Sequence, residues 1–276
     1  MRIARDLPQL HAALAELTAG GQRLALVPTM GALHEGHLAL VRAARQAAPR
    51  VMASIFVNPL QFNPNEDLAR YPRDEAGDLA KLQAAGCDLV WLPSVAVMYP
   101  PDRATVIEVT GPAEGWEGAA RPGHFRGVAT VCTKLFCQTR ADVALFGEKD
   151  WQQLQVVRRV AADLNLPIAI QGCPTVREPD GLAMSSRNRF LSPAERTTAP
   201  TLARVMREVV AALTGGAAPV PVLDAAWAEL AAAGFGLDYL ALVEPATLRE
   251  TTTLPARLIA AARLGTVRLL DNMAVG

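Results

Sequence analysis

Short apolar runs alternate with amphipathic stretches along the first two thirds of the chain. Residues 24–27 and 51–57 are rich in aliphatic side chains, a composition typical of buried strands. In residues 34–47, Leu38 and Val41 recur at the spacing that places side chains on one face of a helix. By these criteria we expect strands at 24–27, 51–57, 88–92, 143–146 and 168–172, and helices at 34–47, 75–85, 127–139 and 150–164.

The order of these elements predicts the fold class. Strands that alternate with helices form βαβ units, and such units build a mainly parallel sheet. The pattern changes near residues 173–181, which contain two prolines and Gly181. We therefore expect an α/β domain over residues 1–175 and a smaller α+β domain over residues 176–276.

The smaller domain shows its own sequence of elements. Two helical stretches come first, and three strands follow, the last two of which meet at Leu264 and Gly265 as in a hairpin. The expected helices are 193–213 and 222–233 with a loop at 215–221 between them, and the expected strands are 238–243, 257–262 and 266–270.

The composition limits the classes of function. The chain has 276 residues, 51% of them hydrophobic, which is enough to bury a substantial core. Its 27 basic and 27 acidic residues cancel, whereas nucleic-acid-binding proteins usually carry a basic excess. We therefore expect no nucleic-acid partner, although a local basic pocket stays possible. No apolar leader and no apolar run of about 18 residues occur, so we expect a cytoplasmic protein without a membrane partner.

The four cysteines, Cys87, Cys132, Cys137 and Cys173, include no C-x-x-C pair. We expect four reduced, buried thiols, as in a cytoplasmic protein. A metal or redox role is the alternative, and no neighbouring residue in the sequence supports it.

The segment 28–37 (PTMGALHEGH) joins a predicted strand to a predicted helix. In parallel sheets this position lies at the carboxyl end of a strand, where ligands bind. Gly31 and Gly36 allow the backbone to approach a ligand closely. His34 and His37 share one face of the first helical turn, where unpaired N–H groups and the helix dipole suit a phosphate. Both imidazoles can donate hydrogen bonds to phosphate oxygens.

Two other interpretations of this histidine pair stay open. The first is a pair of surface histidines near a helix cap. The second is a metal site, but the metalloprotease motif H-E-x-x-H places its histidines four residues apart rather than three. The remaining histidines, His11 and His124, offer no obvious third ligand. The phosphate site is favoured by the strand–turn–helix context.

A polar and basic segment follows the expected domain boundary. Gly181 gives it flexibility, and Ser185, Ser186 and Arg187 supply hydroxyl and guanidinium donors that can clamp phosphates. The alternative is an ordinary loop that leads to the helix start at Ser192.

Two further strand ends carry polar residues. Lys149 can neutralise a phosphate and Asp150 can cap the following helix, whose first turn holds Gln153. Asn58 and Gln61 follow another strand, and such amides suit recognition of hydroxyl or carboxylate groups. Lys149 could equally be a solvated surface lysine.

Arg126 lies in a loop before a predicted helix and is a candidate anion-binding residue, or else a surface arginine. Each of these signals is modest alone. Together they place donors at several strand ends and on one basic loop, which is the layout expected for a nucleoside triphosphate.

These motifs together identify a family. His34-x-Gly36-His37 resembles the HIGH motif of the nucleotidyltransferase superfamily, and residues 184–187 (MSSR) resemble its KMSKS-type partner loop. Five long motifs in the same order are specific, whereas a lone HxGH would not be. The segments 28–37, 56–62, 123–130, 146–154 and 177–188, with 268–272 near the end, are similar to the pantoate–β-alanine ligase (pantothenate synthetase) family.

The resemblance implies a fold and a reaction. The family has a Rossmann-like nucleotide-binding domain with a C-terminal lid, and it acts as a homodimer. ATP, accompanied by Mg²⁺, and pantoate give pantoyl adenylate and pyrophosphate. β-Alanine then attacks the adenylate, which gives pantothenate and AMP.

The resemblance also implies roles by motif position. His37 would be the catalytic proton donor, assisted by His34 and Lys149. Gln61 and Gln153 would hold pantoate, with Gln61 also near β-alanine. ATP would be contacted by Met30, Gly31, Ala32, Leu33, His34, Glu35, Gly36, His37, Gly147, Glu148, Lys149, Asp150, the backbone of Val176, Met184, Ser185, Ser186 and Arg187.

The departures from the family pattern are small. Trp151 stands where tyrosine is expected, Gln138 where asparagine is common, and the Ala-rich stretch 200–240 matches more loosely. Two rival functions stay open: an enzyme with the same ATP site and another acceptor, such as a cytidylyltransferase, and a non-catalytic nucleotide-binding regulator.

Overall fold

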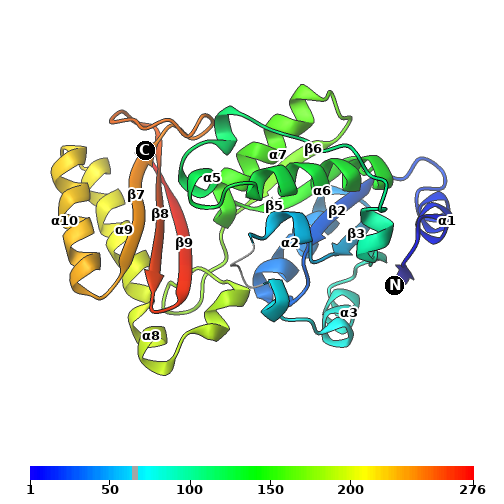
Figure 1. Cartoon of the computed structure of the whole chain (residues 1–276), viewed down its shortest axis with the longest axis horizontal. Coiled ribbons are helices and arrows are strands. Elements are labelled where there is room, and N and C mark those ends of the chain that lie inside the picture. The colour runs from blue at the N-terminus through cyan, green and yellow to red at the C-terminus, as the bar shows by residue number, and fades with distance from the viewer. Residues whose placement is uncertain (64–67) are drawn as a thin grey trace. The chain divides into compact units, whose positions relative to one another are not determined.

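The chain forms two compact units, which are shown in the computed structural model of Figure 1. The structure describes residues 1–63 and 68–276. The first unit comprises Met1–Gly147 and Gln153–Cys173, and the second comprises Glu148–Gln152 and Pro174–Gly276. A short segment after residue 147 therefore belongs with the C-terminal part. The division into a nucleotide-binding domain (1–175) and a lid domain (176–276) stays a prediction.

In the described part of the chain, the first unit contains a six-stranded sheet in the order β1-β4-β3-β2-β5-β6. Every neighbouring pair of strands is parallel. The parallel sheet expected from the alternation of strands and helices is thus confirmed. The strands are β1 (Arg2–Ala4), β2 (Leu24–Thr29), β3 (Arg50–Ile55), β4 (Leu89–Trp91), β5 (Val143–Gly147) and β6 (Ala169–Cys173).

Helices connect these strands and supply the core of the first unit. In β2, residues 24–27 are at most 1% exposed, as expected for a central strand that is covered on both faces. Leu40, Val41 and Ala44 of the following helix pack in the same core cluster. The helices are α1 (Leu7–Leu17), α2 (Glu35–Ala47), α3 (Glu75–Ala84), α4 (Val95–Met98), α5 (Trp116–Ala120), α6 (His124–Thr139) and α7 (Trp151–Asp163), with 3₁₀ turns η1 (Pro59–Gln61), η2 (Leu68–Arg70) and η3 (Gly111–Ala113). The 3₁₀ turn η4 (Glu148–Asp150) and the first two residues of α7 belong to the second unit.

The first two elements, β1 and α1, were not expected from the sequence. Helix α1 begins after Asp6, whose carboxylate accepts a hydrogen bond from the Gln9 N–H at 2.8 Å, and Pro8 lies in its first turn. Only Leu10 and Ala13 of this helix are buried. Leucines at positions 7, 10, 14 and 17 recur at helical spacing, so the sequence did carry a signal for this helix.

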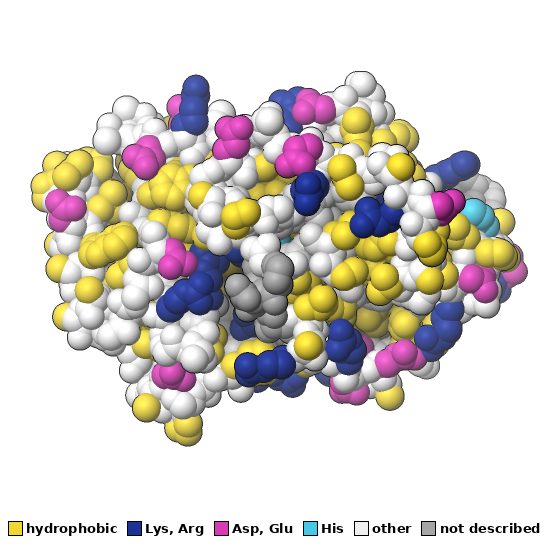
Figure 2. All heavy atoms as spheres, in the orientation of Figure 1, with side chains coloured by type: hydrophobic (Ala, Val, Ile, Leu, Met, Phe, Trp, Pro, Cys, Tyr) yellow, Lys and Arg dark blue, Asp and Glu magenta, His cyan; other side chains and the backbone are white. Residues whose placement is uncertain are grey.

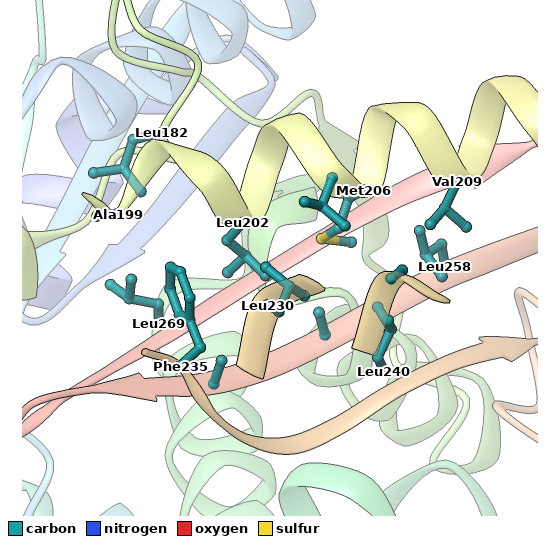
Figure 3. Packing of buried hydrophobic residues seen from close by; sticks show 14 of the residues in the cluster. Leu182, Ala199, Leu202, Met206, Val209, Leu230, Phe235, Leu240, Leu258 and Leu269 are labelled. Atoms are coloured by element: carbon teal, nitrogen blue, oxygen red, sulfur yellow. The ribbon is translucent and has the colours of Figure 1, made fainter. Parts of the chain in front are cut away.

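The second unit contains an antiparallel sheet in the order β7-β8-β9. Helices α9 and α10 pack on one face of this sheet (Figure 1). Figure 3 shows Leu202 and Met206 of α9 and Leu230 of α10 within the buried cluster that they form with Leu258 and Leu240 of the sheet. The elements are η5 (Ser186–Phe190), α8 (Pro193–Thr198), α9 (Pro200–Thr214), α10 (Pro219–Ala232), β7 (Gly236–Val243), β8 (Ala256–Leu264) and β9 (Val267–Val275).

Several boundaries in this unit differ from the expected ones, and proline explains two of them. The helix expected at 193–213 is divided into α8 and α9, because Pro200 has no N–H to continue the hydrogen-bond ladder and instead starts a new helix. Pro219 likewise starts α10, so the loop expected at 215–221 is shorter. The hairpin at Gly265 is present, but β9 continues to Val275, well past the expected end at residue 270.

One expectation about the cysteines was wrong. Cys87, Cys132 and Cys173 are buried, but Cys137 on α6 is exposed. All four are free thiols. Burial raises the pKa of Cys132 to about 12 and that of Cys87 to about 11, so both keep their protons at neutral pH.

The surface carries charges of both signs. On the face seen in Figure 2, basic and acidic side chains are interspersed with apolar ones, in line with the equal totals of 27 and 27. Among the described residues, no helix has the length and apolar character needed to cross a membrane.

Candidate active site

Strand β2 marks a switch point in the parallel sheet. It lies between β3 and β5, so the chain moves to one side of β2 for β3 and β4, and to the other side for β5 and β6. In parallel sheets, ligands bind at the carboxyl ends of strands that flank such a point. Residues 30–37 follow β2, Asn58 and Gln61 follow β3, and Gly147 ends β5. The expected site segments of the first unit therefore leave neighbouring strands at one edge of the sheet.

His34 and His37 lie at the N-terminus of α2. His34 is the N-cap residue, and its Nδ1 atom accepts a hydrogen bond from the Gly36 N–H at 3.1 Å. The Nδ1 atom of His37 accepts one from the His34 N–H at 3.3 Å, and the ring centroids are 4.2 Å apart. A ring nitrogen that accepts a hydrogen bond carries no proton, so each neutral ring holds its proton on Nε2. The turn thus supplies two Nε2–H donors.

The turn before this helix is held by a buried carboxylate. Asp78 of α3 is 1% exposed, and its two oxygens accept hydrogen bonds from the N–H groups of Ala32 and Leu33 at 2.7 and 2.8 Å. Gly31 has φ +81° and a Cβ there would lie 3.0 Å from Asp78 Oδ2, so glycine is needed for this close approach. Lys81 donates to the Leu33 carbonyl at 2.9 Å and lies 3.7 Å from the Asp78 carboxylate. The backbone of the turn is therefore fixed from α3.

Gln61 is buried within a network of polar side chains. Its Oε1 accepts from Asn58 Nδ2 at 2.9 Å, and its Nε2 donates to the sulfur of Met30 at 3.0 Å. Asn58 Oδ1 accepts from the Tyr99 hydroxyl at 2.8 Å. Burial raises the pKa of Tyr99, so that hydroxyl keeps its proton and remains a donor. The structure thus brings two predicted site residues, Met30 and Gln61, into direct contact.

The turn that carries Gln61 approaches α6 very closely. Asn58 Nδ2 donates to the Gly127 carbonyl at 3.1 Å. A Cβ at Gly127 would lie 2.2 Å from the Leu60 carbonyl oxygen and 2.6 Å from the Gln61 nitrogen, so only glycine fits there. Arg126, the candidate anion-binding residue, is exposed on the first turn of α6.

In the second unit, a pocket brings together Lys149 and the Ser-Ser-Arg loop. Lys149 lines it with Ser185 and Arg187, and Arg268 and Asp271 of β9 form another part of its wall. Ser185 is the N-cap residue of η5, and its Oγ accepts a hydrogen bond from the Arg187 N–H at 3.3 Å. Three of the residues expected to bind phosphate therefore share one pocket.

The backbone of Lys149 is held by a buried asparagine. Asn272 of β9 is 4% exposed, and its Nδ2 donates to the carbonyls of Glu148 and Lys149 at 2.9 and 2.8 Å. Its Oδ1 accepts from Arg257 Nε at 2.7 Å. The Arg257 guanidinium also lies 3.2 Å from the Glu148 carboxylate and stacks 3.5 Å from the centre of the Trp151 ring. The segment that carries Lys149 is thus fixed by β8 and β9.

The chain around Gly181 forms a hydrogen-bonded turn, and the flexibility expected of it stays a prediction. Arg177 and Ala183 pair as an antiparallel bridge, and Gly181, with φ +93°, donates its N–H to the Glu178 carbonyl at 2.8 Å. Arg177 makes a bidentate ion pair with Asp271 at 2.6 and 2.8 Å. Two charged bonds therefore hold the base of this turn.

A second ion-pair group supports the same turn. Arg196 donates to the carboxylates of Glu178 and Asp180, each at 2.6 Å. The hydrogen bond from Arg196 lowers the pKa of Asp180, so its carboxylate stays charged at neutral pH. Asn188 donates to Glu178 at 2.9 Å and to the Ala183 carbonyl at 3.1 Å. The segment that carries the residues expected to clamp phosphates is thus held by ion pairs and side-chain hydrogen bonds.

Comparison with known proteins decides the family. The sequence model described as pantoate-beta-alanine ligase matches residues 2–274. A pantothenate synthetase of Acidiphilium cryptum is 62% identical, with both chains covered in full, and one of Granulibacter bethesdensis is 58% identical over 99% of this chain and 96% of its own.

The chain belongs to the pantoate–β-alanine ligase family. The resemblance carried by the five motifs is therefore confirmed. Solved structures agree with this assignment. The pantothenate synthetase of Thermus thermophilus superposes with a TM-score of 0.94 at 49% identity and covers 99% of both chains. The pantoate-beta-alanine ligase of Francisella tularensis, described as a complex with beta-gamma ATP and beta-alanine, has a TM-score of 0.85 at 33% identity over 99% of this chain and 97% of its own.

The other predicted site residues of this ligase-family chain lie at defined positions. Glu35 is exposed on α2 and pairs with Arg42. Gln153 is partly buried on α7, and the Val176 carbonyl accepts a hydrogen bond from the Met184 N–H at 2.9 Å. In the described part of the chain, no three His, Cys, Asp or Glu side chains are grouped to hold a metal ion.

Three supporting residues were not found from the sequence. Asp78 lies 46 positions from the Ala32 N–H that it binds, and Tyr99 lies 41 positions from Asn58. Arg257 contacts Glu148 across 109 positions. No local motif surrounds any of the three, because such contacts depend on the tertiary fold. The one available signal was a charged or polar residue within an apolar run, as for Arg257.

Proposed function

We propose that this enzyme joins pantoate and β-alanine to form pantothenate, with ATP converted to AMP and pyrophosphate. The observation that carries the proposal is the pair of imidazoles at the N-terminus of α2, each with a proton on Nε2. Together with the helix dipole, these donors suit phosphate groups. Membership of the pantoate–β-alanine ligase family supports the choice of acid and amine. The Francisella tularensis relative, whose structure contains beta-gamma ATP and beta-alanine, supports the choice of nucleotide and amine.

The first step is an in-line displacement at the α-phosphorus of ATP. A carboxylate oxygen of pantoate attacks, the bond to the bridging oxygen breaks, and pyrophosphate leaves. The protein has to position the reactants and stabilise the negative charge that develops on the phosphate oxygens. We assign this role to His37 as proton donor, with His34 and Lys149, and with Ser185, Ser186 and Arg187.

The remaining ATP contacts are proposed for residues near these side chains in the sequence. They come from the turn before α2 and the first residues of that helix (Met30, Gly31, Ala32, Leu33, Glu35 and Gly36), from the end of β5 and the turn after it (Gly147, Glu148 and Asp150), from Met184, and from the backbone of Val176.

The second step is acyl transfer to an amine. The nitrogen of β-alanine attacks the acyl carbon of the adenylate, the bond from that carbon to the phosphate oxygen breaks, AMP leaves, and the amine gives one proton to the solvent. The adenylate is already activated, so correct placement of the amine supplies most of the acceleration. Gln61 and Gln153 hold the pantoyl group in this proposal, and Gln61 also lies near β-alanine. The amide network around Gln61 supports its role in recognising a polar ligand.

Magnesium enters as the MgATP complex. A magnesium ion bound to nucleotide phosphates keeps several waters and needs few protein ligands. The side chains proposed to bind ATP are mostly cationic groups, hydroxyls and imidazoles rather than carboxylates. This composition fits a magnesium ion that is held mainly by the phosphates of ATP. The C-terminal unit is proposed to act as a lid that excludes water, because acyl adenylates hydrolyse. We further propose a cytoplasmic homodimer without a nucleic-acid partner.

A direct assay tests the function. The protein is mixed with MgATP, pantoate and β-alanine, and pantothenate and AMP are measured by mass spectrometry. We expect both products in equal amounts, and no pantothenate when any one substrate is omitted. A panel of other acids in pyrophosphate exchange separates this ligase from an enzyme with another acceptor. ATP binding without turnover of any acid would favour a non-catalytic regulator and contradict the proposal.

A further inference from the structure

His124, at the start of α6, holds the backbone of Gln61. The ring Nδ1 atom lies 2.8 Å from the Gln61 carbonyl oxygen, and Nε2 lies 3.1 Å from Arg121 Nη1. Arg121 Nη2 also donates to the Gln61 carbonyl, at 3.3 Å. His124 is 6% exposed and Gln61 is 8% exposed, so these bonds form away from bulk water. Two side chains thus converge on one carbonyl oxygen of the turn.

The neighbours of the His124 ring determine its tautomer. Arginine is always protonated and has no acceptor, so the Arg121 guanidinium donates and His124 Nε2 accepts. The Gln61 carbonyl can only accept, so His124 Nδ1 must carry the proton and donate it. The ring is therefore neutral, with its proton on Nδ1. This is the opposite of the tautomer deduced for His34 and His37.

The close approach at Gly127 makes this contact sensitive to small displacements. Because a Cβ at Gly127 would lie 2.2 Å from the Leu60 carbonyl oxygen, η1 and α6 are packed backbone against backbone. The side-chain amide of Gln61, in turn, is set by Asn58 and Met30. The hydrogen bonds to its carbonyl fix the main chain from which that amide projects.

We infer that His124, kept as the Nδ1–H tautomer by Arg121, is a positioning residue that sets Gln61 for the acid substrate. This inference rests on the proposed role of Gln61 in binding pantoate. His124 acts through the backbone of Gln61 and makes no proton transfer in the reaction. The residue therefore governs how well the acid is held rather than the rate of bond formation.

Two variants separate the two nitrogens of the ring. In His124→Asn, the side-chain amide nitrogen can occupy the place of Nδ1 and still donate to the Gln61 carbonyl. In His124→Gln, the amide reaches the place of Nε2, so the pair with Arg121 can persist while the donor to Gln61 is lost. His124→Asn thus keeps the hydrogen bond to the Gln61 carbonyl, and His124→Gln keeps the one from Arg121.

Steady-state kinetics with varied pantoate or varied ATP give the first readout. We expect His124→Gln to raise the KM for pantoate about tenfold, the effect of losing one buried hydrogen bond, with the KM for ATP within about twofold of wild type. His124→Asn should stay within about threefold of wild type for both substrates. A wild-type KM for pantoate in His124→Gln, or an equal change for ATP, would overturn the inference.

A second readout uses the wild-type protein alone and does not depend on how the variants fold. Long-range ¹H–¹⁵N spectra distinguish the two neutral tautomers, and the signals of the four histidines can be assigned through the backbone. We expect the proton of His124 on Nδ1 at neutral pH. A proton on Nε2, or on both nitrogens, overturns the inference whatever the activity shows. If the wild type makes no pantothenate, the proposed function fails, and the geometry of His124 is then decided by the spectrum.

Discussion

His37 accepts at its Nδ1 atom a hydrogen bond from the backbone N–H of His34, at 3.3 Å, and the two rings lie 4.2 Å apart. Histidine here fills the place that glutamate or glutamine takes in an ordinary capping box. A glutamate would satisfy the same backbone donor but would present a negative charge to a phosphate. An imidazole that accepts at Nδ1 instead presents an N–H at Nε2. His37 can therefore cap the helix through Nδ1 and donate to a phosphate through Nε2.

Replacement of His37 by alanine should slow adenylate formation about 100- to 1000-fold, the usual effect of losing one preorganised donor. Pantoate-dependent pyrophosphate exchange measures this step. His11→Ala is the matched control, because His11 is exposed on α1 and far along the chain from the proposed site. A wild-type exchange rate in His37→Ala would remove His37 from the mechanism.

The tautomers of the histidine pair can be observed directly. His34 and His37 should both carry their proton on Nε2, because each Nδ1 accepts a backbone N–H. Long-range ¹H–¹⁵N spectra of the free enzyme at neutral pH test this. Addition of a non-hydrolysable ATP analogue should shift the Nε2 signals much more than the Nδ1 signals. Protons on Nδ1 in both rings would contradict the capping arrangement.

Asp78→Asn should destabilise the turn before α2. The substitution keeps the shape of the side chain but replaces one oxygen by an NH₂ group, which then faces the N–H of Ala32 or Leu33. Two donors in contact at a buried site lower the free energy of unfolding by about 1–3 kcal/mol. Urea denaturation measures this loss, with the exposed Asp102→Asn as control. Equal stabilities of the two variants would show that Asp78 does not hold the turn.

Much of the fold could be predicted from the sequence, because central strands bury both faces and their apolar runs are unmistakable. The run at 24–27 is one example. The order of the strands was not predictable in this way, since it depends on contacts across the whole chain. β1 was too short to show a pattern. The break at Pro200 did have a sequence signal, because a proline inside a helical pattern ends one helix or starts the next.

The candidate site was predictable only where its residues are close in sequence. His34 and His37 formed a visible motif, and Ser185 to Arg187 formed another. The residues that hold these two motifs in place could not be recognised from the sequence. Asp78 reads as one more acidic residue on the surface of a helix, and the polar pair Asp271 and Asn272 resembles the end of a strand. In the structure, β9 continues through both, because each is buried and paired, with Arg177 and Arg257 respectively.

Gln61→Ala should weaken the binding of pantoate much more than that of ATP. The side-chain amide is lost, but the backbone of the turn before α2, held by Asp78, keeps its hydrogen bonds. We expect pantoate affinity to fall about tenfold or more, as for the loss of a buried hydrogen bond to a charged group. Separate calorimetric titrations with the two ligands measure this, and Gln83→Ala, exposed on α3, serves as control. Equal losses for both ligands would contradict the assignment.

Asn272→Asp should disturb Lys149 through its main-chain carbonyl rather than through its side chain. The aspartate keeps the acceptor for Arg257 but places a negatively charged oxygen against the carbonyls of Glu148 and Lys149, where the asparagine NH₂ donates at 2.9 and 2.8 Å. The backbone that carries Lys149 must then shift, so we expect the KM for ATP to rise about tenfold, equivalent to about 1.4 kcal/mol.

The matched control for this variant is Asn165→Asp, which makes the same change of charge at an exposed position after α7. A simple electrostatic effect of one added negative charge on ATP would appear in both variants. A rise in the KM for ATP confined to Asn272→Asp would show that Asn272 acts through the geometry of the Lys149 segment. If Asn272→Asp and Asn165→Asp bind ATP equally well, then the buried asparagine serves only to join β9 to its neighbours, and Lys149 owes its position to other contacts.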